Sequence, residues 1–187
     1  MRKLIASINM TLDGFCNHTA GIVSDELHEY FNKQLRSTDT LLYGRITYQL
    51  MEDAWPAMVK NPTGNKPMDE FAVLIDNITK VVFSKTLKST EWRNTTLVHG
   101  DLKEEVLKLK QQSGSDIFVG SPSLIAQLTE MNLIDEYRLC LHPVILGSGL
   151  VLFKNITNKV ELRLVYTTTF QSGVVVLHYD RVNTGNK

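Results

Sequence analysis

The stretch IFVGSPSLIAQLTEMNLIDE, residues 117–136, is the part of the sequence that best indicates the fold. It begins as a short apolar run, breaks at Gly120 and Ser121, and resumes with helical spacing directly behind a proline. This order is typical of a buried strand that turns straight into a helix with Ser121 as its N-cap. Gly120 lets another group approach the main chain. The free N–H groups around Ser123 and Leu124 then favour an anion such as a phosphate.

The same arrangement recurs in LLYGRITY, residues 41–48. Gly44 ends an apolar run, Arg45 supplies a fixed cation, and Thr47 supplies a hydroxyl just inside the next helix. A third apolar run ends at Ser84. The carboxyl ends of parallel strands share one edge of a sheet, where open α/β sheets bind their ligands. These strand ends therefore predict a dinucleotide site, and the missing GxGxxG pattern argues against a Rossmann domain.

The rest of the chain alternates short β runs with helical stripes, which predicts one α/β domain over residues 1–187. Helices are expected over residues 24–36, with Ser24 as N-cap, and over residues 101–114. The stretch WPAMVKNPTGNKP, residues 55–67, is predicted to be a surface or lid loop. Its Trp55 is read as a lid over the substrate or as a half-buried anchor.

The C-terminal third changes character, because it contains three strand-like runs in succession. These are residues 135–146, 160–170 and 173–182, and the last two are expected to pair around residues 171–173 as an antiparallel edge. Residues 135–146 and 173–182 carry apolar side chains on both faces. We therefore expect these two runs to form the interface of a homodimer.

Composition limits the possible partners and the cellular setting. The 187 residues contain 20 Lys and Arg against 20 Asp and Glu, so no basic excess suggests nucleic acid. No apolar window reaches the length of a membrane span, and a cytoplasmic protein is expected. The cysteines, Cys16 and Cys140, are predicted to be free and buried, and the scattered histidines suggest no metal site.

Five stretches together resemble one known family: SINMTLDGF, DTLLYGRITYQLM, KVVFSKTL, IFVGSPSLIAQLTEMNLIDEYRL and HPVILGSGLVLF. In this order they resemble the dihydrofolate reductase-like family, and within it the C-terminal reductase domain of the bifunctional riboflavin-biosynthesis deaminase-reductase. The resemblance implies a three-layer α/β fold with a mixed, mostly parallel sheet, helices on both faces and an antiparallel C-terminal edge. It also implies NADPH as hydride donor, and often a homodimer.

The resemblance assigns cofactor-binding roles to residues that the pattern of strand ends had already indicated. Gly44, Arg45 and Thr47 would contact the cofactor phosphates, Ser84 would contact the adenosine end, and Gly120, Ser121, Ser123 and Leu124 would form the pyrophosphate turn. Family members hold an unusual cis peptide in that turn, and we expect it between Gly120 and Ser121. Arg45 is expected to favour NADPH over NADH, the alternative being a pair with Glu52 on its own helix.

Two acidic positions of the family are replaced in this sequence. The acid that dihydrofolate reductases place four residues before Phe31 is Leu27 here, and the glutamate that precedes the glycine turn in riboflavin-pathway reductases is Val119. Asp13, in TLDGF, is the remaining candidate for a catalytic acid, with a structural turn as the alternative.

The predicted function is NADPH-dependent reduction of a small heterocycle, most like 5-amino-6-(5-phosphoribosylamino)uracil. A pterin reductase of the dihydrofolate reductase type and a non-catalytic NADPH or nucleotide sensor are the alternatives.

Overall fold

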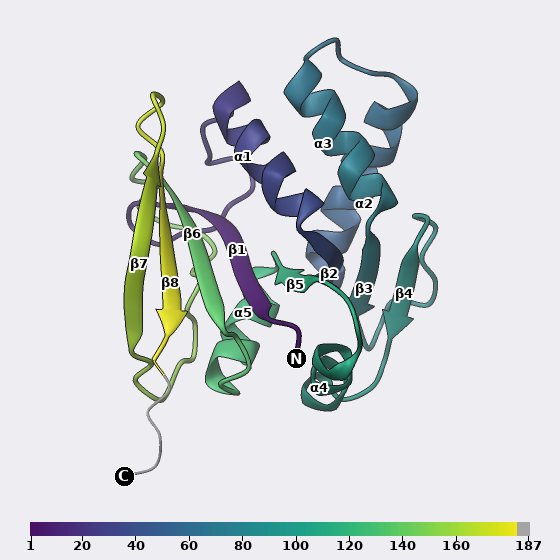
Figure 1. Ribbon diagram of the computed structural model, residues 1–187, viewed down its shortest axis with the longest axis vertical. Coiled ribbons are helices and arrows are strands. Elements are labelled where there is room, and N and C mark those ends of the chain that lie inside the picture. Colours follow the sequence, from purple (N-terminus) through teal and green to yellow (C-terminus); the bar gives the residue numbers. More distant parts are fainter. Residues whose placement is uncertain (183–187) are drawn as a thin grey trace.

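The computed structural model describes residues 1–182 and contains one eight-stranded sheet (Figure 1). Its spatial order is β4-β3-β2-β5-β1-β6-β8-β7. The strands are β1 (Leu4–Thr11), β2 (Thr38–Gly44), β3 (Thr79–Phe83), β4 (Thr95–Val98), β5 (Asp116–Val119), β6 (Glu136–His142), β7 (Leu162–Thr169) and β8 (Val175–Arg181). Strands β1 to β6 pair in parallel, while β8 runs antiparallel to both β6 and β7. This confirms the mixed, mostly parallel sheet with an antiparallel C-terminal edge.

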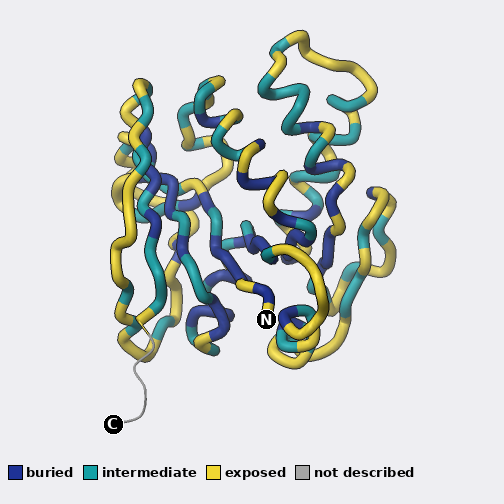
Figure 2. Tube along the Cα trace, in the orientation of Figure 1, coloured by how far each residue is buried: buried dark blue, intermediate teal, exposed yellow. Residues whose placement is uncertain are grey.

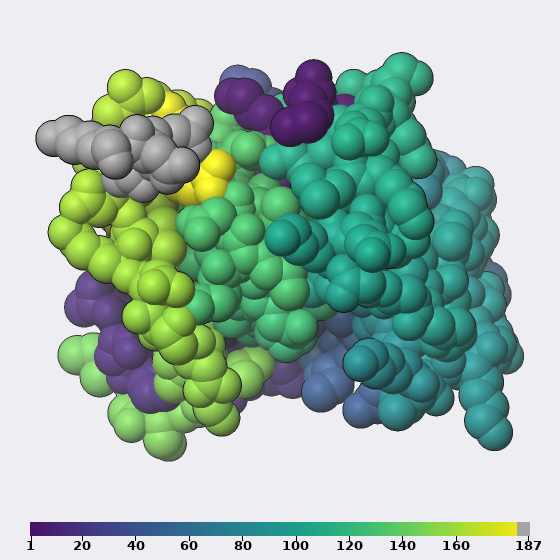
Figure 3. Space-filling model, turned by 90° about the horizontal axis from the view of Figure 1, so that it is seen from below, coloured from purple at the N-terminus to yellow at the C-terminus, as the bar shows by residue number. Residues whose placement is uncertain are grey.

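Helices cover both faces of the sheet, as the three-layer prediction requires. One face carries α1 (Asp25–Arg36), α2 (Arg45–Lys60) and α3 (Lys66–Asn77), and the other carries α4 (Leu102–Gln111) and α5 (Pro122–Glu130). Figure 3 shows this second face from below, with α5 in green beside the teal segment that contains α4. The light green segment that follows β6 lies along α5.

The central strands are buried on both faces, which explains their nearly continuous apolar runs. In β1, Leu4, Ala6 and Ile8 pack with α4 and α5, while Ile5 packs on the opposite side with residues of α2 and α3. Figure 2 shows the resulting dark blue core in the middle of the sheet. The predicted N-cap of α1 is confirmed, because the Ser24 hydroxyl accepts a hydrogen bond from the Leu27 N–H at 3.3 Å.

The predicted loop over residues 55–67 is wrong. Helix α2 continues through Pro56 to Lys60, and only residues 61–65 connect it to α3, a helix that was not predicted. A proline inside a helix costs roughly 3 kcal/mol. Tertiary packing outweighs that cost here, since the Trp55 ring lies 4.6 Å from the Phe71 ring between centroids. Trp55 is thus a partly buried anchor between α2 and α3.

Most of the surface predicted for self-association is not exposed, although Ile145 and Leu146, at the end of the first predicted run, are exposed. β6 and β8 are interior strands, and their apolar side chains on both faces are buried inside this chain: Cys140 and Val176 on the α1 side, Tyr137 and Leu139 on the other. The edge strand on this side of the sheet is β7, which pairs with β8 through the predicted hairpin. Apolar residues on both faces of these strands therefore reflect the helices and loops that cover them.

Both cysteines are free and buried, as predicted. Within residues 1–182, no helix combines the length and the apolar character that a membrane crossing requires. The same residues hold no group of three or more His, Cys, Asp and Glu side chains that could bind a metal ion.

Candidate functional site

The predicted strand ends meet at one edge of the sheet. In the parallel register Gly44 of β2 lies opposite Phe83 of β3, which lies opposite Val98 of β4. On the other side of β2, Leu42 lies opposite Val119, the last residue of β5. The segments that follow these strands therefore leave the sheet side by side, as the sequence predicted.

Two of these segments are in direct contact. The Gly44 N–H donates a hydrogen bond to the Ser121 hydroxyl at 2.9 Å, deep in the protein. A Cβ atom on Gly44 would lie 3.3 Å from the Ser123 hydroxyl oxygen and 3.7 Å from Leu124 Cγ. The start of α2 and the start of α5 thus form one continuous backbone surface, and a side chain at Gly44 would intrude on it.

Ser121 is the N-cap residue of α5, as predicted, but its hydroxyl does not cap the helix. The hydroxyl serves Gly44 instead, and within residues 1–182 no side chain caps the start of α5 or of α2. A helix start has N–H groups without intrahelical partners and carries a partial positive charge. Two such starts in contact make an anion-binding surface.

The peptide bond between Gly120 and Ser121 is trans, so the predicted cis bond is wrong. Ser121 has an extended backbone, with φ −96° and ψ 120°. In this conformation its hydroxyl reaches the Gly44 N–H. A cis bond between non-proline residues costs about 3 kcal/mol, and the trans form already provides the contact between the two turns.

Arg45 begins α2 with an exposed side chain, while Thr47 is half-buried in the first turn of the helix. The Arg45 Nη1 donates to the Gln49 side-chain oxygen at 3.1 Å. The alternative pairing with Glu52 is not formed, because the Glu52 carboxylate accepts from the Tyr48 hydroxyl and from main-chain N–H groups of the β3–β4 connection. The Arg45 guanidinium therefore remains available at the sheet edge.

Ser84 follows β3 and organises a tight turn. Its hydroxyl accepts hydrogen bonds from the N–H groups of Thr86 and Leu87, at 3.2 and 2.9 Å. Its carbonyl oxygen lies 2.6 Å from the Nδ1 atom of His99, which directly follows β4. His99 is not among the predicted site residues, although its place directly behind the TTLV strand is a signal equivalent to that of Ser84.

Asp13 is held in a turn by several donors. One carboxylate oxygen accepts from the Thr11 hydroxyl at 2.6 Å, and the other accepts from the N–H groups of Leu146 and Gly147 at 3.0 and 2.8 Å. These hydrogen bonds, that of Thr11 foremost, lower the pKa of Asp13. A carboxylate stabilised in its charged form is a poor proton donor. The geometry thus favours the structural turn over the catalytic acid.

The two replaced acidic positions have apolar surroundings. Leu27 is buried in a cluster with Cys140, Val174 and Val176, and Val119 is fully buried among residues of the α4–α5 side. Neither position offers a group that could handle a proton.

His142 anchors the loop that follows β1. Its Nδ1 accepts a hydrogen bond from the Ile22 N–H at 2.9 Å, so its Nε2 carries the proton and faces the Asn9 side-chain oxygen at 3.1 Å. Burial lowers the pKa of His142, which keeps the ring neutral. Together with Asp13, this histidine holds both ends of the loop over residues 12–24 beside the sheet edge.

Comparison with known proteins identifies the family of this chain. The sequence profile of the RibD C-terminal domain matches residues 2–176. The chain belongs to the RibD C-terminal domain family. This confirms the resemblance to the C-terminal reductase domain that the sequence indicated.

Relatives of this RibD C-terminal domain support the same family. This chain is 34% identical over 182 residues to the uncharacterized protein YyaP of Bacillus subtilis, and the match covers 95% of this chain and 94% of YyaP. Among solved structures, a putative riboflavin biosynthesis protein from Shewanella is similar with a TM-score of 0.73 and 18% identity, covering 97% of this chain and 99% of that one.

Two further solved structures share the fold of this domain. Dihydrofolate reductase from Enterococcus faecalis complexed with NADP(H) is similar with a TM-score of 0.61 and 16% identity, covering 96% of each chain. A Thermotoga maritima deaminase/5-amino-6-(5-phosphoribosylamino)uracil reductase is similar with a TM-score of 0.67 and 15% identity, covering 97% of this chain and 57% of that one. At these identities the likeness shows the dihydrofolate reductase-like fold.

Proposed function

We propose that this chain is an NADPH-dependent reductase of a small heterocyclic substrate, most like 5-amino-6-(5-phosphoribosylamino)uracil. The observation that carries the proposal is the contact between two helix starts without side-chain caps, made by the Gly44 N–H and the Ser121 hydroxyl. Family membership and the NADP(H) complex of the similar dihydrofolate reductase support it.

The residues of the site fit a dinucleotide. Glycine at position 44 lets the start of α2 approach the start of α5, because a Cβ there would lie 3.3 Å from the Ser123 hydroxyl oxygen. A pyrophosphate would meet the N–H groups at the start of α5, near Ser123 and Leu124. Arg45 and Thr47, at the start of α2, would contact phosphate oxygens, and the turn at Ser84 would receive the adenosine end. In this proposal Gly120 lets the pyrophosphate approach the main chain of the turn.

NADPH, when bound, supplies the hydride. The protein's contribution is to position that donor against the substrate and to keep the loop over residues 12–24 in place. Asp13 and His142 perform the second task, because their polar atoms are bonded to main-chain N–H groups of neighbouring loops. With Asp13 engaged in this way, we assign proton delivery to solvent water.

A pterin reductase is the weaker alternative, because Leu27 is packed among apolar side chains where the pterin-binding acid would stand. A non-catalytic NADPH or nucleotide sensor is favoured by one observation: neither Leu27 nor Val119 can transfer a proton.

NADPH oxidation, followed by absorbance, separates these functions. Oxidation on addition of 5-amino-6-(5-phosphoribosylamino)uracil, and its absence with dihydrofolate, is expected. The variant Gly44→Val should abolish cofactor binding by filling the contact with Ser123 and Leu124. Ala57→Val, at the far and exposed end of α2, is the control. Saturable NADPH binding without oxidation across a panel of pterins and aminopyrimidines would establish the sensor, and no binding of either nicotinamide cofactor would end the proposal.

A further inference from the structure

Asn9 is the one exposed residue of β1, although β1 lies between β5 and β6 in the interior of the sheet (Figure 1). Asn9 is the register partner of Cys140, which packs against α1, so its side chain points to the face that carries α1. Interior strands that pair in parallel are normally covered on both faces. An exposed polar side chain on such a strand therefore marks a part of this face that a small molecule can reach.

Asn9 lies close to the turn proposed to hold the cofactor. β5 pairs with β1 only from Leu4 to Ala6, and its chain then turns at Gly120. A Cβ on Gly120 would lie 3.5 Å from the Ser7 carbonyl oxygen, so the turn approaches β1 at Ser7. Asn9 follows about 6.6 Å further along the strand. Because hydride transfer requires the donor and the acceptor to be in contact, the substrate has to lie beside the cofactor in this region.

Two hydrogen bonds fix the direction of the Asn9 amide. The Ile22 N–H donates to His142 Nδ1 at 2.9 Å, so the neutral ring carries its proton on Nε2. That nitrogen lies 3.1 Å from the Asn9 side-chain oxygen and 3.8 Å from the Cys140 sulfur, so the amide oxygen is the nearer acceptor. His142 is buried, and its ring cannot turn over without losing the bond from Ile22. The Asn9 oxygen is thus occupied, and its NH2 group points away from His142.

The NH2 group of Asn9 sets the chemistry of what it can bind. Within residues 1–182 it donates to no protein group. An amide nitrogen offers two N–H donors and accepts nothing, so the ligand atom that meets it must be an acceptor. A carboxylate at this position would select the opposite chemistry, because it only accepts and therefore binds ring amino groups.

We propose that Asn9 is a specificity-determining residue that donates a hydrogen bond to a ring carbonyl oxygen of the substrate, with His142 as the positioning residue that fixes its amide. This inference rests on the proposed function and narrows its substrate class. It favours heterocycles with ring carbonyl groups over heterocycles that carry amino groups at the same positions. A site built to donate a hydrogen bond rejects an analogue that lacks the acceptor, because its own donor is then left unpaired.

Two small pyrimidines test the proposal: 5,6-diaminouracil, and 2,4,5,6-tetraaminopyrimidine, in which amino groups replace both ring carbonyls. Each is titrated calorimetrically into the protein with NADP+ present, at a pH where both compounds are neutral. Wild type should bind the diaminouracil more tightly. Asn9→Ala should weaken the binding of the diaminouracil about five-fold, as one hydrogen bond predicts, and leave the tetraamino compound unchanged. Asn9→Asp keeps an oxygen for His142 but replaces the NH2 group by a second oxygen, and should reverse the preference.

The role of His142 has a separate readout. His142→Phe keeps a ring but releases the Asn9 amide, which can then turn either its oxygen or its NH2 group toward the ligand. The preference between the two pyrimidines should shrink, whereas damage to the fold would weaken both alike. The control is Asn155→Asp, which makes the same change at an exposed amide in the segment along α5, on the other face of the sheet. It should leave the preference at its wild-type value.

An equal loss of both pyrimidines in Asn9→Ala overturns the proposal, because Asn9 would then only support His142 and its loop. Weaker NADP+ binding with an unchanged pyrimidine preference also overturns it, since Asn9 would then contact the cofactor. A wild type that binds neither pyrimidine, or both equally, has the same consequence. NADPH oxidation tests the proposed function separately. A wild type that prefers the diaminouracil in the titration but oxidises NADPH with no substrate contradicts the reductase and leaves the role of Asn9 in binding intact.

Discussion

At the scale of single residues, we expect Arg45 to set which nicotinamide cofactor the proposed site prefers. Its guanidinium is exposed and bonded only to Gln49 among residues 1–182, so no acid has to be displaced when a phosphate binds. We expect Arg45→Ala to cost about 1.5 to 3 kcal/mol in NADPH affinity and to leave NADH almost unchanged. Titration of both cofactors into wild type, Arg45→Ala and the control Gln49→Ala measures this. An equal loss for both cofactors would place Arg45 on the pyrophosphate instead.

A substitution at Asp13 tests whether its carboxylate has a structural or a catalytic role. The variant Asp13→Asn loses one of the oxygen acceptors that bind Thr11, Leu146 and Gly147. We expect it to unfold at a lower temperature, while turnover per folded, cofactor-bound molecule stays within about three-fold of wild type. Thermal melts and steady-state rates on one preparation separate the two effects. Unchanged melting together with lost turnover would make Asp13 the proton donor.

At the scale of elements, α2 holds a proline that the tertiary structure tolerates. Pro56 lies in the interior of the helix, where it removes a main-chain N–H donor. Trp55 and Met51 hold this part of α2, with the Trp55 Nε1 lying 3.4 Å from the Met51 sulfur. We expect Pro56→Ala to raise the free energy of unfolding by about 1 to 3 kcal/mol, because alanine restores the helix donor.

Denaturant unfolding measures this change, with Ala57→Gly as the control that should destabilise the same exposed stretch by about 1 kcal/mol. A loss of stability in Pro56→Ala would mean that the proline ring itself packs usefully at this point of α2.

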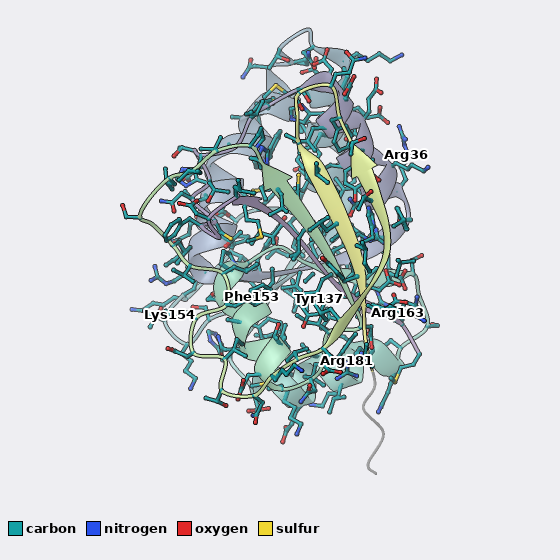
Figure 4. The ribbon with its side chains drawn as sticks, turned by 90° about the vertical axis from the view of Figure 1, so that its left-hand side faces the viewer. Arg36, Tyr137, Phe153, Lys154, Arg163 and Arg181 are labelled. Carbon is teal, nitrogen blue, oxygen red and sulfur yellow. The ribbon has the colours of Figure 1, made fainter. Side chains whose placement is uncertain are left out.

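At the scale of the whole molecule, an exposed apolar surface suggests how two copies would meet. The loop patch consists of exposed apolar residues: Leu12, Ile145, Leu146, Leu150, Val151 and Phe153. Ile145 is 75% exposed and Leu12 is 63% exposed. Figure 4 shows Phe153 beside Tyr137, whose ring centroid is 6.3 Å away, so the patch is continuous with the core. Such a surface is typical of an interface.

We therefore expect a homodimer through the loop patch, which keeps Ile145 and Leu146 of the first predicted run, because β6 and β8 are interior strands. Light scattering at micromolar concentration should give about twice the 21.2 kDa mass of the chain. Ile145→Asp should give the monomer, whereas Val73→Asp, on exposed α3, should not. A wild-type mass near one chain would contradict the dimer.

Stability of the whole fold should fall in acid because of His178. Burial, followed by the charge of Arg138, lowers the pKa of His178 to about 4. An unfolded histidine binds its proton near pH 6.5, so between about pH 6.5 and 4 the unfolded chain binds more protons than the folded one. The stabilisation is complete above about pH 6.5 and is lost as pH falls to 4, by at most about 3 kcal/mol.

Urea unfolding across this pH range measures the slope. The variant His178→Phe keeps a ring in the stack with Tyr166, where the ring centroids are 3.9 Å apart. It should reduce the dependence of the unfolding free energy on pH in this range. Exposed His18→Gln is the control and should retain the wild-type slope. A slope unchanged by His178→Phe would assign the acid sensitivity to other groups, such as His142.

The sequence alone determined the family, the order of strands and helices in residues 117–136, and the strand ends at Gly44, Ser84 and Gly120, because local periodicity and turn residues specify where elements begin and end. Only the tertiary structure decided which groups meet across the sheet. The Ser121 hydroxyl bonds to Gly44, which lies 77 residues away, in place of its own helix. Long-range contacts of this kind also carry α2 through Pro56 and place β6 and β8 inside the sheet. Packing and register outweigh the preferences of single residues at these positions.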